Sequence, residues 1–433
     1  QSDRICMYEV QPPALRALPV EVNWNNGNSL ALDQHGAEMQ ALVRALGMDA
    51  LPVLAVRASA PQPRYLVGSG AVQQVCEYAQ SLDAGCIVVD EELSPAQQRN
   101  WERAAKCAVL DRRDVILEIF ATRAETRDAR LQVELARLEH QLPRLTAQWT
   151  HLSRQRGSVK GTRGEGETQL EMDRRAVRDR ITRLRRDLER VGRDRRLNRG
   201  RRARTGIPVV ALVGYTNAGK TSLMRLLADG GPGGENRPFA TLDTRLRRVR
   251  TPGGPILLSD TVGFLRRLPT ELIDAFHSTL EEAAQADILL HVLDASTEEA
   301  AEHELVTRGV LQRIGAVGQP MILVLNKSDR ESAANVLPIP RAVMDDYIAV
   351  VRTSAIPGAG VEELIAAIGD AVASRHVTTD LEIPAARYDL LAAIHRAGRI
   401  VAEDHTGESI RVQAVLQRED LARILRAIQG TAP

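Results

Sequence analysis

Apolar positions divide the first part of the chain into alternating strand-like and helix-like stretches. Short apolar runs occupy residues 51–56, 86–90 and 108–110, and amphipathic stretches occupy residues 71–81 and 95–105. Strands that alternate with helices predict βαβ units around a small parallel sheet. The turn Gly68-Ser69-Gly70 precedes the first of these helices. We interpret it as an ordinary turn into a helix, with a second nucleotide site as the alternative.

The middle of the chain carries two apolar stripes that step by four and three residues. The first consists of Leu131, Leu135, Leu138, Leu142 and Leu145, and the second of Val177, Ile181, Leu184, Leu188 and Val191. An a/d seam on each segment predicts two long helices that pack antiparallel. Pro143 should kink or end the first helix. The glycine- and arginine-rich residues around 155–166 cannot form a hydrophobic core, so they should make a basic tip between the helices.

The remaining pattern predicts a larger α/β part and a small α+β unit at the end. Buried-type strands are predicted at 209–213, 256–260, 288–294, 321–326 and 348–351, followed by a helix at 361–372. A linker should then run to Pro384. The last fifty or so residues predict a helix at 388–396, a strand at 409–415 and a helix at 418–428. A chain of 433 residues is too long for a single core, so three or four units are expected.

A phosphate-binding loop follows the first strand of the larger α/β part. Residues 209–213 lead into Gly214-Tyr215-Thr216-Asn217-Ala218-Gly219-Lys220-Thr221-Ser222, which has the form G-x-x-x-x-G-K-T. Main-chain N–H groups and the positive end of the following helix favour a bound phosphate. The two glycines let the chain approach the anion, Lys220 reaches the β- and γ-oxygens, and Thr221 can ligate Mg²⁺. The chain should therefore bind a nucleoside triphosphate.

Two later segments indicate that the base is guanine. The strand at 321–326 ends in Asn326-Lys327-Ser328-Asp329, and Thr353-Ser354-Ala355 follows the next apolar run. The Asp329 carboxylate can accept hydrogen bonds from N1–H and the 2-amino group of guanine. Adenine offers neither donor, so ATP would leave a charged acceptor unpaired. Asn326 and Lys327 would brace the loop and cover the base, and residues 353–355 would close over its other side.

Two segments between the loop and the base motif should respond to the γ-phosphate. Asp260-Thr261-Val262-Gly263-Phe264 ends a strand with an aspartate that would hold Mg²⁺, with Gly263 N–H facing the γ-phosphate. Phe239-Ala240-Thr241-Leu242-Asp243-Thr244 is a plausible switch, in which we prefer Thr241 to Thr244 as the Mg²⁺ ligand. Phe264 stands where many GTPases place a glutamine that orients water. Intrinsic hydrolysis should be slow unless another side chain of the chain, or a partner, orders the water.

The charge of the chain is segregated. The net charge is only +1, but residues 123–204 contain 24 Lys and Arg against 12 Asp and Glu. Arginine outnumbers lysine 23 to 1 in this segment. Arginine suits bidentate phosphate contacts and stacking on unpaired bases, so RNA is the favoured partner and a merely solvated helical pair is the alternative. No segment has membrane-spanning length or a signal-peptide layout, and Gln1 is not a natural start.

The remaining candidate ligands point to structural roles. The four cysteines, Cys6, Cys76, Cys86 and Cys107, have no metal or redox spacing. They are expected to be isolated thiols in a reducing compartment. His291, in the strand 288–294, should be a residue at the edge of the core.

Several motifs together resemble the HflX family of translational GTPases. They are residues 64–70 (RYLVGSG), 93–100 (LSPAQQRN), 131–136 (LQVELA), 166–171 (GETQLE) before 173–175 (DRR), 214–220 (GYTNAGK) and 239–243 (FATLD). The resemblance implies binding to the large ribosomal subunit, GTP hydrolysis stimulated by the ribosome, and splitting of stalled ribosomes under stress. It also implies that residues around 155–166 reach toward the peptidyl-transferase region, and it supports Thr241 as a Mg²⁺ ligand. The chain departs from the family at Asp243-Thr244-Arg245, usually Asp-Pro-Thr, and at Gly164-Glu165-Gly166, usually Gly-Pro-Gly.

We therefore predict an α/β multidomain protein. It should comprise an N-terminal α/β domain (1–122), a basic helical hairpin (123–205), a P-loop GTPase domain (206–376) and a small C-terminal α+β domain (377–433). Catalysis is assigned to Lys220, Thr241 and Gly263, and Mg²⁺ to Thr221, Thr241 and Asp260. The expected protein is a monomeric, cytoplasmic GTPase that uses GTP and Mg²⁺, binds the large ribosomal subunit and its rRNA, and dissociates or rescues stalled ribosomes. A peripheral association with a membrane is left open.

Three other functions fit parts of the pattern. The chain could be an RNA-binding module that uses GTP only to time its release, or an ATP-dependent enzyme that remodels RNA. A metabolic phosphotransferase with the same loop is least favoured, because the switch and base segments would then have no purpose.

Overall fold

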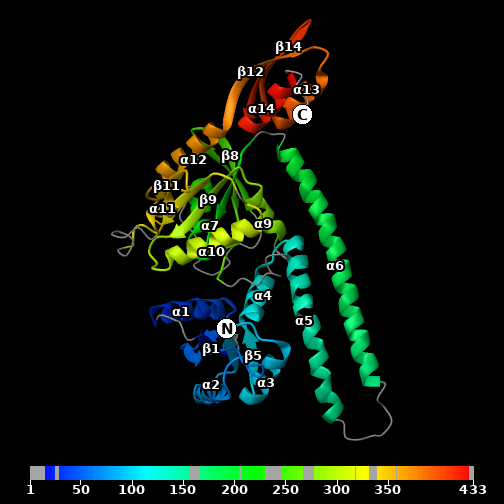
Figure 1. Cartoon of the computed structure of the whole chain (residues 1–433), viewed down its shortest axis with the longest axis vertical. Helices are drawn as coiled ribbons and strands as arrows, with labels where there is room; N and C mark the ends of the chain where they lie inside the picture. Colours follow the sequence, from blue (N-terminus) through cyan, green and yellow to red (C-terminus); the bar gives the residue numbers. More distant parts are fainter. Residues whose placement is uncertain are drawn as a thin grey trace, which may run out of the picture. The chain divides into compact units, whose positions relative to one another are not determined.

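The computed structural model describes residues 15–24, 29–155, 165–203, 207–229, 245–266, 277–316, 318–330, 339–356 and 358–428 (Figure 1). The chain divides into two compact units. One unit combines Gln1–Thr122 with Val133–Thr182, and the other combines Arg123–Gln132 with Arg183–Pro433. The segment predicted as a helical hairpin therefore contributes to both units, and the four domain boundaries stay predictions.

The N-terminal part is an α/β fold around a parallel sheet, as the alternation of strands and helices predicts. Strand β1 lies in its centre and pairs in parallel with β2, β3 and β4, and β5 pairs with β4. The sequence pattern missed β1, and the strand predicted at 51–56 lies slightly later, at β3. The elements are β1 (Arg16–Trp24), α1 (Ser29–Ala45), β2 (Asp49–Ala50), β3 (Leu54–Ala58), α2 (Ser69–Ser81), β4 (Cys86–Val89), α3 (Pro95–Ala105), β5 (Ala108–Asp111) and α4 (Arg112–Arg123).

Local sequence explains two of these helix starts. Gly68 is the N-cap of α2, so the glycine turn opens a helix as expected. At α3, the Ser94 hydroxyl accepts the Gln97 N–H while the Gln97 side chain accepts the Ser94 N–H. This capping box, followed by Pro95 at the first helical position, satisfies N–H groups that the helix itself cannot pair.

The basic segment forms two long helices, α5 (Arg127–Gln155) and α6 (Glu165–Ala203). All ten residues of the two predicted stripes are buried or half-buried. Arg180 of α6 bonds to Glu134 of α5 at 2.8 Å, and Arg195 pairs with Asp128. The later residue of α6 pairs with the earlier residue of α5, so the helices run antiparallel, as predicted.

Two expectations for these helices have different outcomes. Pro143 was predicted to kink or end the first helix; it does not end it, because α5 continues through it to Gln155, and the kink stays a prediction. A proline removes one main-chain hydrogen bond, and the packed stripe on either side evidently outweighs that loss. Residues 156–164 of the predicted basic tip lie outside the described residues.

A six-stranded sheet forms the centre of the larger α/β part. The strand order is β11-β10-β9-β6-β8-β7, and all neighbouring pairs are parallel except β7 with β8. The elements are β6 (Val209–Val213), α7 (Lys220–Asp229), β7 (Arg245–Thr251), β8 (Gly254–Asp260), α9 (His277–Ala284), β9 (Ile288–Asp294), α10 (Ala300–Arg313), β10 (Met321–Asn326), α11 (Arg341–Met344), β11 (Ala349–Arg352) and α12 (Val361–Arg375).

Alternation along β6 explains the layers. Val210 and Leu212 pack in a core cluster with α7 and α12. Ala211 and Val213 point to the opposite face and pack with α9 and α10. Because both faces of the sheet are covered, the central strands β6, β9 and β10 are almost continuously apolar. The carboxyl ends of the parallel strands β6, β8, β9 and β10 lie at one edge of the sheet.

The C-terminal part is a three-stranded antiparallel sheet with two helices, in the order β12-β14-β13. The predicted linker up to Pro384 is wrong, because residues 376–384 form a strand that pairs with β14 along its whole length. Leu381 and Ile383 alternate with polar residues and are buried against α13 and α14, which is the period of a half-buried strand. The elements are β12 (His376–Pro384), α13 (Tyr388–Ala397), β13 (Gly398–Thr406), β14 (Ser409–Gln417) and α14 (Arg418–Ile428).

Candidate functional site

The loop between β6 and α7 has the geometry that its glycines predict. Gly214 has φ +143° and Gly219 has φ +96°, both in a region that favours glycine. A Cβ on Gly214 would collide with the Val292 carbonyl, and one on Gly219 would collide with the Asn326 amide. The loop is therefore pressed against β9 and β10, and only glycine fits at these two positions.

The Lys220 ammonium lies inside this loop. Its Nζ donates to the carbonyls of Gly214 at 2.9 Å and Tyr215 at 2.8 Å. Burial lowers the pKa of Lys220 to about 8, and the Asp260 carboxylate opposes that shift. A buried cation held by two neutral carbonyls is well placed to gain from a phosphate anion.

The side chains of Thr221 and Asp260 contact each other where the phosphate loop enters α7. The Thr221 hydroxyl donates to Asp260 Oδ2 at 2.8 Å, and Asp260 is fully buried at the end of β8. The next residue, Thr261, donates its hydroxyl to the Leu212 carbonyl at 2.6 Å and ties β8 to β6. The structure thus brings together two of the three residues that the sequence assigns to Mg²⁺.

The chain that follows Asp260 is attached to the loop. A Cβ on Gly263 would lie 2.8 Å from Thr216 Cγ2 and 3.1 Å from Lys220 Nζ. Thr216 N–H donates to the Phe264 carbonyl at 2.8 Å, and Phe264 N–H donates to the Gly214 carbonyl at 3.1 Å. The Phe264 ring is 1% exposed and packs in the core. It therefore has neither a polar group nor access to orient a water molecule.

The segments assigned to the base lie together at the ends of β10 and β11. Asn326 Nδ2 donates to the Ala218 carbonyl at 2.7 Å, so the base motif braces the phosphate loop as expected. The Ser354 hydroxyl donates to the Asp329 carboxylate, which remains exposed. Ser328 N–H donates to the Thr353 carbonyl at 3.1 Å, which ties the two segments together.

One residue near the base motif was missed. Lys327 Nζ bonds to Asp294 Oδ2 at 2.6 Å, while Asp294 Oδ1 accepts the N–H and hydroxyl of Ser296. These bonds and the Lys327 charge lower the pKa of Asp294 against the effect of burial. The sequence feature that could have identified Asp294 is its position at the carboxyl end of a buried strand, next to the strand that carries the base motif. Asp294 therefore fixes the direction of the Lys327 side chain.

Part of the predicted site cannot be placed. Phe239, Ala240, Thr241, Leu242, Asp243 and Thr244 lie outside the described residues. The assignments of Thr241 to Mg²⁺ and to catalysis therefore stay predictions.

His291 and the described cysteines lie in buried or half-buried positions that suit structural roles. His291 is 1% exposed in β9, and its Nδ1 contacts the Tyr347 hydroxyl at 2.7 Å. Burial, with Arg308 and Lys220, lowers the pKa of His291 to about 3. Cys76 and Cys86 are buried and Cys107 is half-buried, while Cys6 lies outside the described residues. Among the described helices, none combines the length and the apolar character that crossing a bilayer requires.

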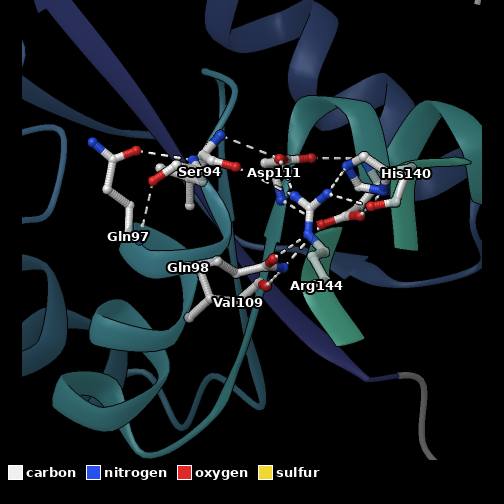
Figure 2. Close-up of polar contacts among 9 residues, drawn as sticks. Ser94, Gln97, Gln98, Val109, Asp111, His140 and Arg144 are labelled. Atoms are coloured by element: carbon white, nitrogen blue, oxygen red, sulfur yellow. Dashed lines mark hydrogen bonds and ion pairs between the residues drawn. The ribbon is translucent and has the colours of Figure 1, made fainter. Parts of the chain in front are cut away.

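A second polar cluster lies in the N-terminal part, where α5 meets β5 and α4 (Figure 2). Donor atoms of Asp111, Asp114 and His140 lie within 4.8 Å of one another, a spacing that would suit a metal ion. However, each carboxylate accepts the main-chain N–H of the other aspartate and caps α4. Burial and the Asp111 charge raise the pKa of Asp114 to about 7.

A guanidinium provides the positive charge in this cluster. Arg144 Nη2 donates to Asp111 Oδ2 at 3.0 Å, Nε donates to Gln98 Oε1 at 2.8 Å, and Nη1 contacts His140. Burial and Arg144 lower the pKa of His140 to about 3, so its ring is neutral at physiological pH. We interpret the cluster as the anchor that holds α5 on the N-terminal sheet.

Replacing Arg144 should destabilise this part of the chain. Arg144→Leu leaves the Asp111 carboxylate, which is 1% exposed, without its cation. The free energy of unfolding should fall by about 2–3 kcal/mol, measured by urea unfolding. The double variant with Asp111→Asn should recover only part of the loss, because the buried charge is gone but a single amide oxygen cannot accept from both Leu93 N–H and Asp114 N–H. Equal stability of the single and double variants would contradict the anchor.

Three features define a P-loop GTPase. They are a mostly parallel sheet with helices on both faces, a glycine loop that surrounds a lysine, and an N-K-x-D segment that is hydrogen-bonded to that loop. Residues 209–327 match a family model described as 50S ribosome-binding GTPase. Residues 33–121 match GTP-binding GTPase N-terminal, and residues 123–202 match GTP-binding GTPase Middle Region.

Curated relatives identify the family. The GTPase HflX of Spirochaeta thermophila is 42% identical over 377 residues, which cover 87% of this chain and 91% of that protein. The GTPase HflX of Escherichia coli is 41% identical over 350 residues, which cover 80% and 81%. The chain belongs to the HflX family of GTPases. A solved GTP-binding protein from Sulfolobus solfataricus, in complex with GDP, is 25% identical with a TM-score of 0.46, covering 83% of this chain and 99% of that one.

Proposed function

We propose that the loop 214–222 holds the phosphates of GTP and that Asp329 selects the guanine base. The observation that carries the proposal is Asn326, whose amide joins the base motif to the phosphate loop by a 2.7 Å hydrogen bond. Asn326 would thus set the distance between the part of the site that holds the phosphates and the part that holds the base. Lys327, fixed by Asp294, would cover the base, and residues 353–355 would close its other side.

The residues below the loop fit a magnesium ion. Thr221 and Asp260 offer a hydroxyl and a carboxylate within hydrogen-bond distance of each other, and hard oxygen ligands of this kind are those that Mg²⁺ prefers. Thr221 and Asp260 would hold the ion, with Thr241 as the predicted third ligand. When bound, Mg²⁺ neutralises charge that develops on the β- and γ-oxygens.

The chain's own groups would then act on the bound phosphates. Lys220 would exchange its two carbonyl partners for phosphate oxygens, and Gly263 would present its N–H to the γ-phosphate. Phe264 contributes no polar group, so the attacking water must be ordered elsewhere. We propose that this ordering is completed on the ribosome, which makes hydrolysis conditional on the partner.

The proposed partner is the large ribosomal subunit, with its rRNA as the surface bound. Two facts support it: the GTPase part matches a family model of 50S ribosome-binding GTPases, and α6 is rich in arginine. We propose that the GTP-bound protein dissociates or rescues stalled ribosomes, acting in the cytoplasm as a monomer. A GTP-timed RNA-binding factor without splitting activity is the second candidate.

The test compares GTP turnover by the full chain with and without purified large subunits. Turnover should be slow alone and should rise when large subunits are added. Sucrose gradients of intact ribosomes with a non-hydrolysable GTP analogue separate the two candidates. Conversion of the 70S peak into subunits supports splitting, and an unchanged peak supports the timed factor. Fast hydrolysis without ribosomes would contradict the role given to Phe264.

A further inference from the structure

Tyr215, the second residue of the phosphate loop, has a side chain that the proposed function does not use. The motif requires only a main chain at this position, yet the ring is 4% exposed. The ring stacks on His303 of α10, with centroids 3.7 Å apart and planes 13° from parallel. His303 is itself held, with its Nε2 3.3 Å from a Glu299 carboxylate oxygen. The Tyr215 ring is thus fixed from the side of α10.

The Tyr215 hydroxyl reaches the segment that follows Phe264. It accepts the main-chain N–H of Arg266 at 2.9 Å. Together with the two main-chain bonds between Gly214, Thr216 and Phe264, three hydrogen bonds join the phosphate loop to residues 264–266. Of these three bonds, the one to Arg266 depends on a side chain of the loop.

This arrangement bears on where the attacking water can be ordered. The ring of Phe264 is in the core, and its N–H and carbonyl are used by the phosphate loop. Phe264 itself therefore offers no group to order water, whereas Gly263 precedes it and Leu265 and Arg266 follow it in the same described segment. Their position depends on the path that the main chain takes through Arg266, which is where the Tyr215 hydroxyl holds it.

We propose that Tyr215 is a positioning residue for GTP hydrolysis, whose hydroxyl sets the path of residues 264–266 relative to the γ-phosphate. The inference rests on the proposed nucleotide site. It assigns the hydroxyl no contact with the nucleotide, because the loop would bind phosphate through main-chain N–H groups that Tyr215→Phe retains. The substitution also retains the ring stacked on His303.

The test is Tyr215→Phe in the full chain, assayed for GTP affinity and for single-turnover hydrolysis on large ribosomal subunits. The rate should fall about tenfold, because a main-chain N–H loses its partner and the segment loses its fixed path. The dissociation constant for GTP should stay within about twofold. A merely structural tyrosine would change stability without this separation of rate from binding.

Tyr347→Phe is the matched control, because it removes another buried tyrosine hydroxyl from the same α/β part of the chain, away from the phosphate loop. It should lower the melting temperature but leave the rate unchanged. A Tyr215→Phe rate no lower than that of Tyr347→Phe would overturn the inference, as would an equal loss of affinity and rate. Lys220→Ala separates this failure from that of the proposed function: if it binds GTP as the unaltered chain does, the nucleotide site itself is misassigned.

Discussion

Asp329→Asn should lower the affinity for GTP by roughly 10⁴-fold, the largest effect expected for a single substitution in the chain. The carboxylate is exposed and oriented by the Ser354 hydroxyl, so its remaining acceptor positions are available to the base. An asparagine would turn an amide NH₂ toward the N1–H and 2-amino donors of guanine, which leaves both sides without acceptors. Xanthine has a carbonyl at C2, so xanthosine triphosphate should become the preferred nucleotide.

Calorimetric titration of GTP, ATP and xanthosine triphosphate against both proteins measures this change. Asp370→Asn is the control, because Asp370 is an exposed aspartate of α12 in the same part of the chain. It should bind GTP like the unaltered protein. Equal affinity of the unaltered protein for ATP and GTP would contradict the role of Asp329 and favour an ATP-dependent enzyme.

Neutralising one face of α6 should lower affinity for the large ribosomal subunit by roughly 10³-fold at 0.1 M salt. Spacings of three, eight and seven residues place four exposed arginines on one helix face, opposite the apolar stripe. These arginines are Arg175, Arg178, Arg186 and Arg193. Each contact with one phosphate of single-stranded RNA contributes about 0.7 to the slope of log affinity against log salt. If each arginine makes one such contact, replacing all four by glutamine removes that contribution four times.

Co-sedimentation with large subunits across a salt series measures both the affinity and its slope. Four exposed arginines outside the helical segment serve as the control: Arg225, Arg247, Arg341 and Arg399. Their replacement by glutamine changes the net charge equally but leaves α6 intact. Equal losses in the two variants would mean that overall charge, and not this face, drives binding. A slope that stays unchanged in the α6 variant would exclude phosphate contacts there.

The P-loop fold was predictable because its signals are local. A β-branched run before a glycine loop, an aspartate at the end of β8 and an N-K-x-D segment at the end of β10 specify which chain ends meet in a parallel sheet. The antiparallel helices were predictable for the same reason, since an a/d stripe needs only its own spacing to be recognised.

The predictions from sequence were wrong where the local residue preferences and the tertiary packing favour different structures. In β1, Pro19 and Glu21 argue against a central strand, yet β1 lies between β3 and β4. The strands that pair with β1 on both sides bury it, although Pro19 and Glu21 do not suggest a buried strand. Pro143 inside α5 and the polar residues of β12 are similar cases, because packing against a neighbouring element outweighs weak propensity.

By itself the sequence determined that this is a GTPase of the HflX family, because phosphate and guanine recognition depend on short segments whose residue types and order are read directly. Only the tertiary structure decided how these segments act on one another. It brought Lys220 onto two carbonyls of its own loop, Asp294 onto Lys327, and Tyr215 between His303 and Arg266. Apart from the Lys220 contacts within its own loop, these contacts join residues far apart in the chain. No local pattern encodes them, because hydrogen bonds and ring stacking depend on distances that only packing sets.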